Sequence, residues 1–293
     1  MNATPRTASV VAGLSEIADR YDAILCDVWG VIHNGRERFP EACEALIEFG
    51  RRRGPVVLIS NVPRPARFVL SQLEELAVPR DTWSGFVASG DATFAELVKR
   101  APGPAWAVGP ARDGGLYEGS GVDLTEIPEH AAFISCTGLF DDEIETPEDY
   151  RERLQVCADR GLEMVCANPD RVVQRGDRMI WCAGALADLY ETMGGKVLMA
   201  GKPYAPIYGL CYAELERLAG KPVEKSRILA IGDGLPTDVV GANNQGLDLL
   251  FVAGGIHAEE LAGADGRMDA SLVDAFLERA DAHARWAAPE LRW

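Results

Sequence analysis

Short apolar runs alternate along this chain with longer segments whose apolar residues recur every three or four positions. A short apolar run bounded by turn residues predicts a buried strand, and the three-to-four spacing predicts an amphipathic helix. Strands that alternate with helices of this length are typical of a parallel sheet with right-handed crossovers. We therefore expect an α/β fold built on a doubly wound parallel sheet. The expected strands are 23–28, 55–59, 85–88, 105–108, 131–135, 163–166, 178–182, 197–200, 227–231 and 248–252, and the expected helices are 41–52, 64–76, 91–100, 147–160, 184–193, 204–219, 237–245 and 270–285.

The middle of the chain differs in composition from the rest. Segment 101–130 is rich in Gly and Pro, and a turn-like cluster separates two apolar runs within 166–182. We interpret residues 84–185 as an inserted α/β module. Residues 1–83 and 186–293 would then build the main sheet together.

Composition and charge narrow the classes of protein to consider. The formal net charge of −16 argues against a nucleic-acid partner, because it repels phosphate backbones. No apolar run approaches the roughly 20 residues that cross a bilayer, and the N-terminal segment lacks the apolar core of a secretory signal. We therefore expect a cytoplasmic protein with no membrane partner. The seven cysteines form no CxxC pair, and several lie inside apolar runs, which predicts buried, reduced thiols.

Four of the apolar runs end in side chains that can do chemistry. Each of these side chains alone is most often a turn or surface residue. The carboxyl ends of parallel strands, however, meet at one edge of a sheet, where open α/β folds carry their chemistry. We therefore expect them to converge: Asp27 after the first run, Ser60 and Asn61 after the second, Lys202 after the third, and Asp233 and Asp238 after the fourth.

Phosphoryl transfer requires a set of this kind. A carboxylate such as Asp27 can attack phosphorus and form an acyl phosphate, which divides one difficult step into two. Mg²⁺ prefers oxygen ligands, which Asp27, Asp233 and Asp238 can supply. The Lys202 ammonium, the Ser60 hydroxyl and the Asn61 amide can hold the oxygens of the transferring group.

The ordered set of strand ends resembles the four motifs of the haloacid dehalogenase (HAD) superfamily, whose phosphohydrolases use an aspartate nucleophile. The motif order, the spacing and the position of the insertion resemble its class IIA branch, and Gly232-Asp233 with Thr237-Asp238 is similar to the fourth motif of that branch. The resemblance extends from about residue 20 to 255. It implies a Rossmann-like core, an inserted α/β cap domain of the C2 type, and small phosphorylated metabolites as substrates.

The resemblance also implies a role for each matching position. The catalytic residues are Asp27 as nucleophile, with Ser60 and Lys202 binding the phosphoryl group. The Mg²⁺ ligands are Asp27, the backbone carbonyl of Trp29, Asp233 and Asp238. The substrate-binding residues are Asn61 and Arg64 after the second motif, and Asn168 and Asp170 in the cap.

Trp29 departs from the pattern of the family. The family's phosphatases place a second Asp two residues after the nucleophile, and its side chain protonates the leaving oxygen and then activates water. Trp29 supplies the backbone carbonyl of that position but no proton transfer. Positioned acid–base catalysis contributes about 10²–10⁴-fold, roughly 3–5 kcal/mol of the barrier. The indole can also act as an aromatic wall against substrate or cap. An Asp-x-Trp-Gly first motif resembles a subgroup of this branch.

His33 is the nearest titratable residue by sequence that could replace the missing acid. It lies in a polar turn, His33-Asn34-Gly35, so a solvent-exposed turn histidine is the favoured interpretation.

The leading hypothesis is a Mg²⁺-dependent phosphatase acting through an aspartyl phosphate on Asp27, slow or restricted in substrate because of Trp29. The alternative is a catalytically degenerate protein that binds and senses a phosphorylated metabolite. A third hypothesis is that the protein transfers the phosphoryl group to an acceptor other than water. Relatives of class IIA often pair through the cap, so a homodimer is a further expectation.

Overall fold

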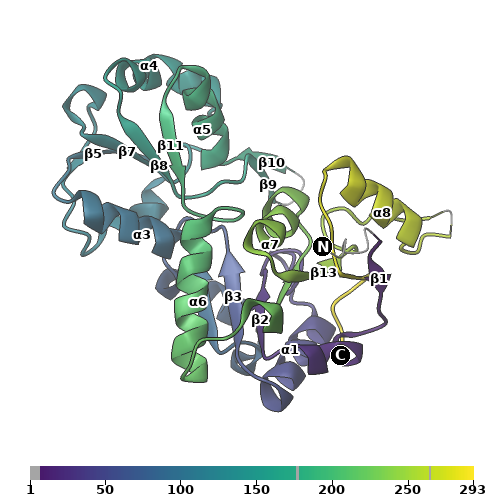
Figure 1. Ribbon diagram of the computed structural model, residues 1–293. Coiled ribbons are helices and arrows are strands. Elements are labelled where there is room, and N and C mark those ends of the chain that lie inside the picture. Colours follow the sequence, from purple (N-terminus) through teal and green to yellow (C-terminus); the bar gives the residue numbers. More distant parts are fainter. Residues whose placement is uncertain (1–6, 176–177, 264) are drawn as a thin grey trace. The chain divides into compact units, whose positions relative to one another are not determined.

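Two parallel sheets form the centres of two units in this protein (Figure 1). The computed structural model describes residues 7–175, 178–263 and 265–293. The first unit comprises the described residues up to Ser60 together with Leu70–Val87 and Tyr208–Trp293, and the second comprises Asn61–Val69 and Ala88–Ile207. No helix in the described ranges is long and apolar enough to span a membrane.

The first unit is built on a seven-stranded sheet whose central strands are buried on both faces. Every residue of β2 (Ala23–Cys26) and β12 (Ile228–Gly232) is buried, and these strands are parallel neighbours. Continuous apolar runs suit such strands because both of their faces are covered. The strand order is β1-β14-β13-β12-β2-β3-β4, with β1 Ser9–Val10, β14 Trp286–Ala288, β13 Asp248–Val252, β3 Val56–Ser60 and β4 Gly85–Ala88.

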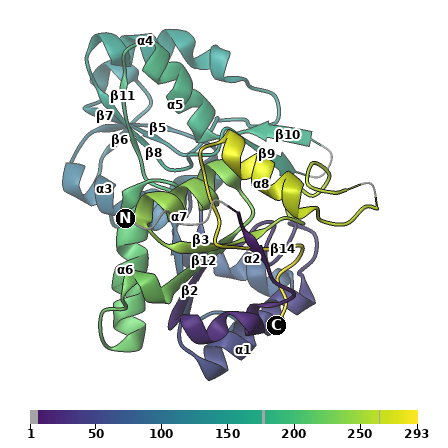
Figure 2. The ribbon, with the colours of Figure 1, turned by 45° about the vertical axis from the view of Figure 1, so that its right-hand side comes forward.

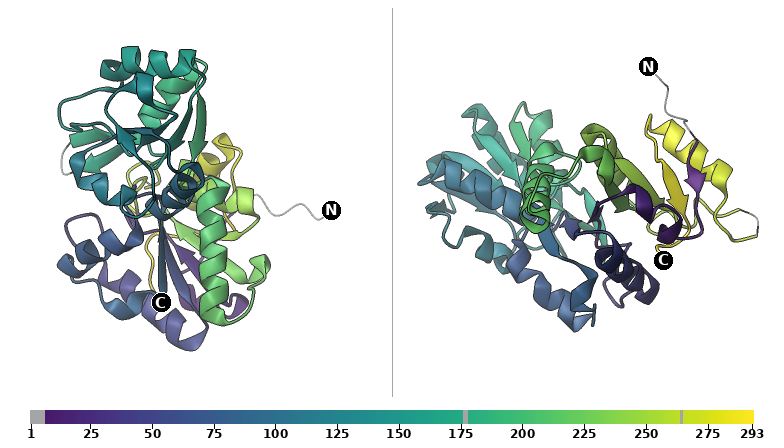
Figure 3. Two further views of the ribbon diagram at one scale, coloured as in Figure 1. Left: turned by 90° about the vertical axis from the view of Figure 1, so that its left-hand side faces the viewer. Right: turned by 60° about the horizontal axis from the view of Figure 1, so that its bottom comes forward.

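Helix α1 (Pro40–Arg52) covers one face of this sheet. Pro40 lies in its first turn, where a missing N–H costs no hydrogen bond. The buried side chains of Leu46 and Phe49 belong to the same hydrophobic cluster as Ile24 of β2. Figure 3 shows α6 running alongside the strands. The other helices with residues in this unit are α2 Leu70–Glu75, α6 Ala205–Ala219, α7 Val240–Gln245 and α8 Ala270–Arg279.

The second unit contains a five-stranded parallel sheet in the order β11-β8-β7-β5-β6. Helices α4 and α5 lie side by side on one face (Figure 2), where Leu154 and Leu186 pack in one cluster with Ile134. On the opposite face, Leu97 of α3 shares a cluster with Phe133. The bounds are β5 Ala105–Val108, β6 Leu124–Thr125, β7 Phe133–Cys136, β8 Glu163–Cys166, β11 Lys196–Met199, α3 Ser89–Arg100, α4 Arg151–Asp159 and α5 Ala183–Thr192, beside a separate antiparallel pair, β9 Val172–Arg175 and β10 Arg178–Trp181.

The predicted α/β class with a parallel, Rossmann-like sheet is confirmed, and every predicted strand is present to within a few residues. All seven cysteines are buried thiols, as predicted. The predicted helix 270–285 is too long, because α8 ends at Arg279 and Asp281 takes a left-handed φ of 49°. Trp286 then lies in β14, between β13 and β1, where pairing with two neighbouring strands outweighs the helix-forming alanines.

The division into two units differs from the predicted boundaries at three segments. Strand β4 was expected in the inserted module, 84–185, but it belongs to the seven-stranded sheet of the first unit. Strand β11 was expected with the main sheet, in 186–293, but it pairs with β8 in the five-stranded sheet. Segment Asn61–Val69 was expected in 1–83, but it belongs to the second unit. Hydrogen bonds explain its placement: the Gly90 amide donates to the Val62 carbonyl, and the Ala66 amide donates to the Asp91 carboxylate.

Candidate active site

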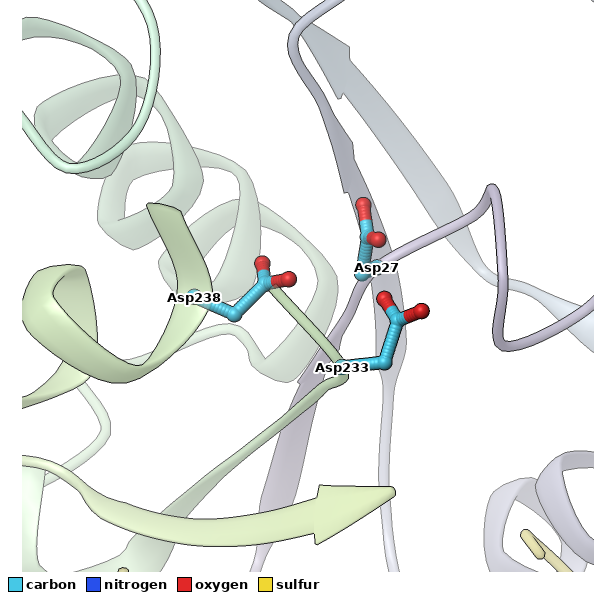
Figure 4. Close-up of side chains that lie close together, drawn as sticks. All are labelled: Asp27, Asp233 and Asp238. Atoms are coloured by element: carbon cyan, nitrogen blue, oxygen red, sulfur yellow. The ribbon is translucent and has the colours of Figure 1, made fainter. Parts of the chain in front are cut away.

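The carboxyl edge of the seven-stranded sheet brings three aspartates together (Figure 4). Asp27 directly follows β2, and Asp233 directly follows the neighbouring strand β12. The Asp27 amide donates to the Ile231 carbonyl at 2.9 Å, so the ladder between the two strands continues to the point where the carboxylates emerge. Asp238 lies in the π-helical turn Leu235–Val239, which opens α7. Parallel pairing therefore delivers the predicted convergence of these three residues.

These carboxylates are crowded and buried. One oxygen from each lies within 4.8 Å of the others, and the side chains of Asp27, Asp233 and Asp238 belong to residues that are 8%, 2% and 5% exposed. Three negative charges at this separation repel one another strongly away from water, and a divalent cation relieves that repulsion. The donor set is made of oxygens alone, which suits a hard cation such as Mg²⁺.

Two glycines allow the backbone to approach Asp233 closely. A Cβ atom on Gly30 or on Gly255 would lie 2.1 Å from Asp233 Oδ2, so a side chain at either position would displace this carboxylate. Gly30 also has a φ of +85°, a conformation that favours glycine. The Ile256 amide donates to Asp233 Oδ2 at 2.8 Å and fixes the carboxylate.

The segment Gly255-Ile256 is a part of the site that the sequence prediction missed. Its signal was present, since Gly254-Gly255 directly follows the apolar run of β13 (Asp248–Val252). A glycine pair at the end of a buried parallel strand indicates close approach of the backbone to another group. Gly232 and Gly234 make the same kind of contact with Asp238, whose Oδ2 accepts a hydrogen bond from the Gly234 amide at 3.0 Å.

Trp29 is half-buried and packs beside the turn that follows it. The indole Nε1 lies 3.3 Å from the position that a Cβ on Gly35 would take. Trp29 also forms a β-bridge with His33, and the Gly30 amide donates to the His33 carbonyl at 2.8 Å. The loop after Asp27 is therefore closed on itself and holds the indole against the 33–35 turn.

His33 is buried, so its interpretation as a solvent-exposed turn histidine is wrong. The residue is 4% exposed, and burial lowers the pKa of its imidazole to about 4. Its Nδ1 accepts a hydrogen bond from the Gly35 amide at 3.0 Å, which places the single proton of the neutral ring on Nε2. A role for His33 as the replacement acid stays a prediction.

Ser60 belongs to the same sheet edge as Asp27. It is the last residue of β3, which pairs with β2 in parallel register. The first unit thus contains Asp27, Trp29, Ser60, Asp233 and Asp238 of the predicted site residues.

The second unit contains the other predicted site residues, and several of them contact one another. Lys202 follows β11 and is buried, and the Asn61 carboxamide contacts its backbone and the Asp170 carboxylate. Asn168 Oδ1 accepts a hydrogen bond from the Asp170 amide. Arg64 lies apart from these contacts, with its Nε 3.8 Å from the buried carboxylate of Asp113.

Comparisons with known proteins agree with this arrangement. Residues 24–123 match a family model for haloacid dehalogenase-like hydrolases, and residues 199–278 match a second, HAD-hydrolase-like model. A crystal structure of a hydrolase of the haloacid dehalogenase-like family from Brucella suis is 42% identical, covers 96% of this chain and 100% of its own, and superposes with a TM-score of 0.84.

Two curated relatives extend the comparison over most of the chain. Bovine chronophin is 27% identical over 285 residues, covering 86% of this chain and 88% of its own length. The 5'-nucleotidase YutF from Bacillus subtilis is 24% identical over 260 residues, covering 88% of this chain and 97% of its own. The chain therefore belongs to the haloacid dehalogenase-like hydrolases, in their class IIA branch.

Proposed function

We propose that this protein is a Mg²⁺-dependent phosphatase of a small phosphorylated metabolite and that it acts through an aspartyl phosphate on Asp27. One observation carries the proposal: three buried carboxylates crowd the carboxyl edge of the sheet, with one oxygen of each within 4.8 Å of the others. The relatives support the reaction class, since YutF is named a 5'-nucleotidase. The residues within 84–185 that belong to the second unit serve as the cap in this proposal, and a homodimer remains an expectation.

The metal site would be formed by Asp27, Asp233 and Asp238 together with the backbone carbonyl of Trp29. Mg²⁺ bound there would offset the carboxylate charges and the charge of the substrate phosphate. The close approach of the backbone at Gly30 and Gly255 keeps the Asp233 carboxylate in one place, as a metal ligand requires.

The chain's own residues account for the chemical steps. Asp27 attacks phosphorus, so a bond forms between its carboxylate oxygen and phosphorus while the bond to the ester oxygen breaks. Ser60 and Lys202 hold the phosphoryl oxygens as charge develops on them. Water then attacks the same phosphorus, and the carboxylate of Asp27 leaves as inorganic phosphate forms.

Trp29 sets the limit on this mechanism. The ester oxygen departs with a negative charge unless a proton reaches it, and the indole at position 29 donates no proton at neutral pH. The neutral His33 ring is buried within the loop that follows Asp27. We therefore expect esters with acidic leaving groups, such as aryl phosphates, to react faster than alkyl phosphates by about 10²–10⁴-fold. The predicted substrate-binding residues, which would select the substrate in this proposal, are Asn61, Arg64, Asn168 and Asp170.

The experiment is a screen of phosphate monoesters with Mg²⁺, comparing the wild type with Asp27→Asn. Asp81→Asn is the matched control, because Asp81 is exposed and lies in the same unit. The proposal requires Mg²⁺-dependent turnover in the wild type and the control, and none in Asp27→Asn. Turnover that survives in Asp27→Asn would refute the nucleophile.

Trp29 also supports a second candidate, a protein that binds a phosphorylated metabolite without turnover. This second function predicts that the protein binds a phosphorylated metabolite tightly in the presence of Mg²⁺ and that the metabolite is recovered intact. Calorimetric titration followed by mass spectrometry of the ligand separates the two functions.

A further inference from the structure

The carboxamide of Asn61 contacts both polar groups of one peptide residue. The Lys202 amide donates to Asn61 Oδ1 at 2.7 Å, and Asn61 Nδ2 donates to the Lys202 carbonyl at 3.2 Å. Asn61 therefore binds residue 202 as a neighbouring β-strand would, through one donor and one acceptor. Lys202 and Asn61 are both at least nine-tenths buried, so these bonds are shielded from competing water.

Asp170 fixes which way the carboxamide faces. Asn61 Nδ2 also donates to Asp170 Oδ1 at 3.0 Å, so both hydrogens of the amide have acceptors. A flipped amide would set its oxygen against a carboxylate and a carbonyl. The Asp170 loop is anchored in turn, because the Gly184 amide at the start of α5 donates to the Asp170 carbonyl at 3.1 Å.

Gly201 shows how tightly this contact is packed. A Cβ at Gly201 would lie 2.5 Å from Asn61 Oδ1 and 2.8 Å from Ser89 Oγ. Gly201 directly precedes Lys202, so a side chain there would push the loop away from Asn61. The backbone around Lys202 is therefore held by hydrogen bonds to Asn61 and by the close packing of Gly201 against Asn61 and Ser89.

We propose that Asn61 is a positioning residue for Lys202. Its carboxamide fixes the backbone of the residue that carries the ammonium through one donated and one accepted hydrogen bond. The inference rests on the proposed function for its kinetic consequence but not for the contact itself.

The kinetic test is a double-mutant cycle with Asn61→Ala and Lys202→Ala, using 4-nitrophenyl phosphate and Mg²⁺ with the full chain. Asn61→Ala should lower kcat/KM by about 10²-fold, the scale of a small misplacement of a reacting group. On the Lys202→Ala background it should change kcat/KM by no more than about twofold, because the group it positions is gone. A general loss of stability would instead lower activity equally on both backgrounds.

The chain offers a matched control. The Asn243 carboxamide contacts the backbone of His283 in the same way, accepting from its amide at 2.9 Å and donating to its carbonyl at 2.8 Å. Asn243→Ala removes the same pair of hydrogen bonds elsewhere and should leave kcat/KM within about twofold of the wild type. Gly201→Ala is an independent perturbation of the Lys202 loop and should reproduce the loss seen in Asn61→Ala.

The structural test is amide hydrogen exchange at Lys202, followed by NMR. Exchange should accelerate by about fivefold or more in Asn61→Ala, as expected for one lost hydrogen bond, and stay unchanged in Asn243→Ala. If the wild type turns over no ester, the proposed function fails, and this exchange rate alone decides the inference. Additive kinetic effects of Asn61→Ala and Lys202→Ala, or unchanged exchange at Lys202, would overturn it.

Discussion

The two units of the protein differ in the electrostatic character of their buried polar groups. At the carboxyl edge of the seven-stranded sheet, Asp27, Asp233 and Asp238 crowd like charges together within 4.8 Å. In the second unit, the buried Asn61 carboxamide has hydrogen-bond partners in the Lys202 backbone, and the buried Asp113 carboxylate lies 3.8 Å from Arg64 Nε. The crowded carboxylates of the first unit therefore call for a cation, whereas Asn61 and Asp113 of the second unit have partners within the protein.

The largest expected effect comes from removing one charge from the crowded edge. Asp233→Asn should lower Mg²⁺-dependent turnover by at least about 10³-fold, because a metal ligand is lost. Without Mg²⁺, the variant should be more stable than the wild type by about 1–3 kcal/mol, because one of three like charges is gone and the Ile256 amide still finds an acceptor. Urea unfolding with and without Mg²⁺ measures both. Equal stability of the two proteins without Mg²⁺ contradicts the account of repulsion.

The next effect concerns the proton that Trp29 does not supply. Trp29→Asp should raise kcat for alkyl phosphates by about 10²-fold or more and change kcat for aryl phosphates little. Trp29→Asn changes the size of the side chain in the same way without adding an acid and should show no such gain. Steady-state kinetics on paired alkyl and aryl phosphates is the measurement. An equal gain in kcat for alkyl phosphates in both variants would assign the effect to the loss of the large indole rather than to acid catalysis.

A smaller effect should follow from disturbing the backbone beside Asp233. Gly255→Ala places a Cβ 2.1 Å from Asp233 Oδ2 and should lower kcat/KM by about 10²-fold through displacement of the carboxylate. Gly50→Ala is the control, since a Cβ on Gly50 of α1 has no neighbour within 4 Å. Full activity in Gly255→Ala would show that the close approach is unimportant for the site.

The smallest effect is expected at the buried carboxylate of the second unit. Burial raises the pKa of Asp113 above 3.8, despite Arg112, Thr137 and Arg64, so its charged form is disfavoured in the folded protein. Between pH 3.8 and the raised pKa, Asp113 is protonated in the folded protein but ionised in the unfolded chain. This difference in proton binding means that the stability of the folded protein falls as the pH rises through that range. Asp113→Asn does not titrate and should therefore be more stable than the wild type at pH 7. The difference in unfolding free energy between the variant and the wild type should shrink as the pH falls to 3.8, which urea unfolding at a series of pH values would record. A difference that does not depend on pH would contradict a raised pKa of Asp113.

Much of the fold could be predicted from the sequence because strands that are buried on both faces have continuous apolar sequences. The runs around Ile24, Leu58 and Ile231 were long enough to detect, and their order along the chain predicted the edge where Asp27 and Asp233 meet. A strand of two residues, such as Ser9–Val10, is too short to show a repeating pattern of apolar and polar residues. The unit boundary was harder to predict, because segment Asn61–Val69 is assigned by hydrogen bonds with residues distant in sequence.

The candidate site shows the same limit. Residue type and spacing predict that Asp27, Asp233 and Asp238 converge, as they do in the structure. They do not reveal that the Asn61 carboxamide binds the Lys202 backbone. Nor does a polar turn sequence reveal that His33 is buried. Such roles depend on three-dimensional neighbours and not on the residue itself.

The central claim is that Asp27 forms a covalent bond to phosphorus at the crowded edge. Because Trp29 does not activate the water that cleaves this bond, the intermediate should accumulate. The direct measurement is acid quenching of the enzyme during turnover of an aryl phosphate with Mg²⁺, followed by peptide mass spectrometry. The account predicts one phosphoryl group on the peptide that contains Asp27 and none in Asp27→Asn. Turnover with the phosphoryl group on another residue, or turnover that persists in Asp27→Asn, would contradict it.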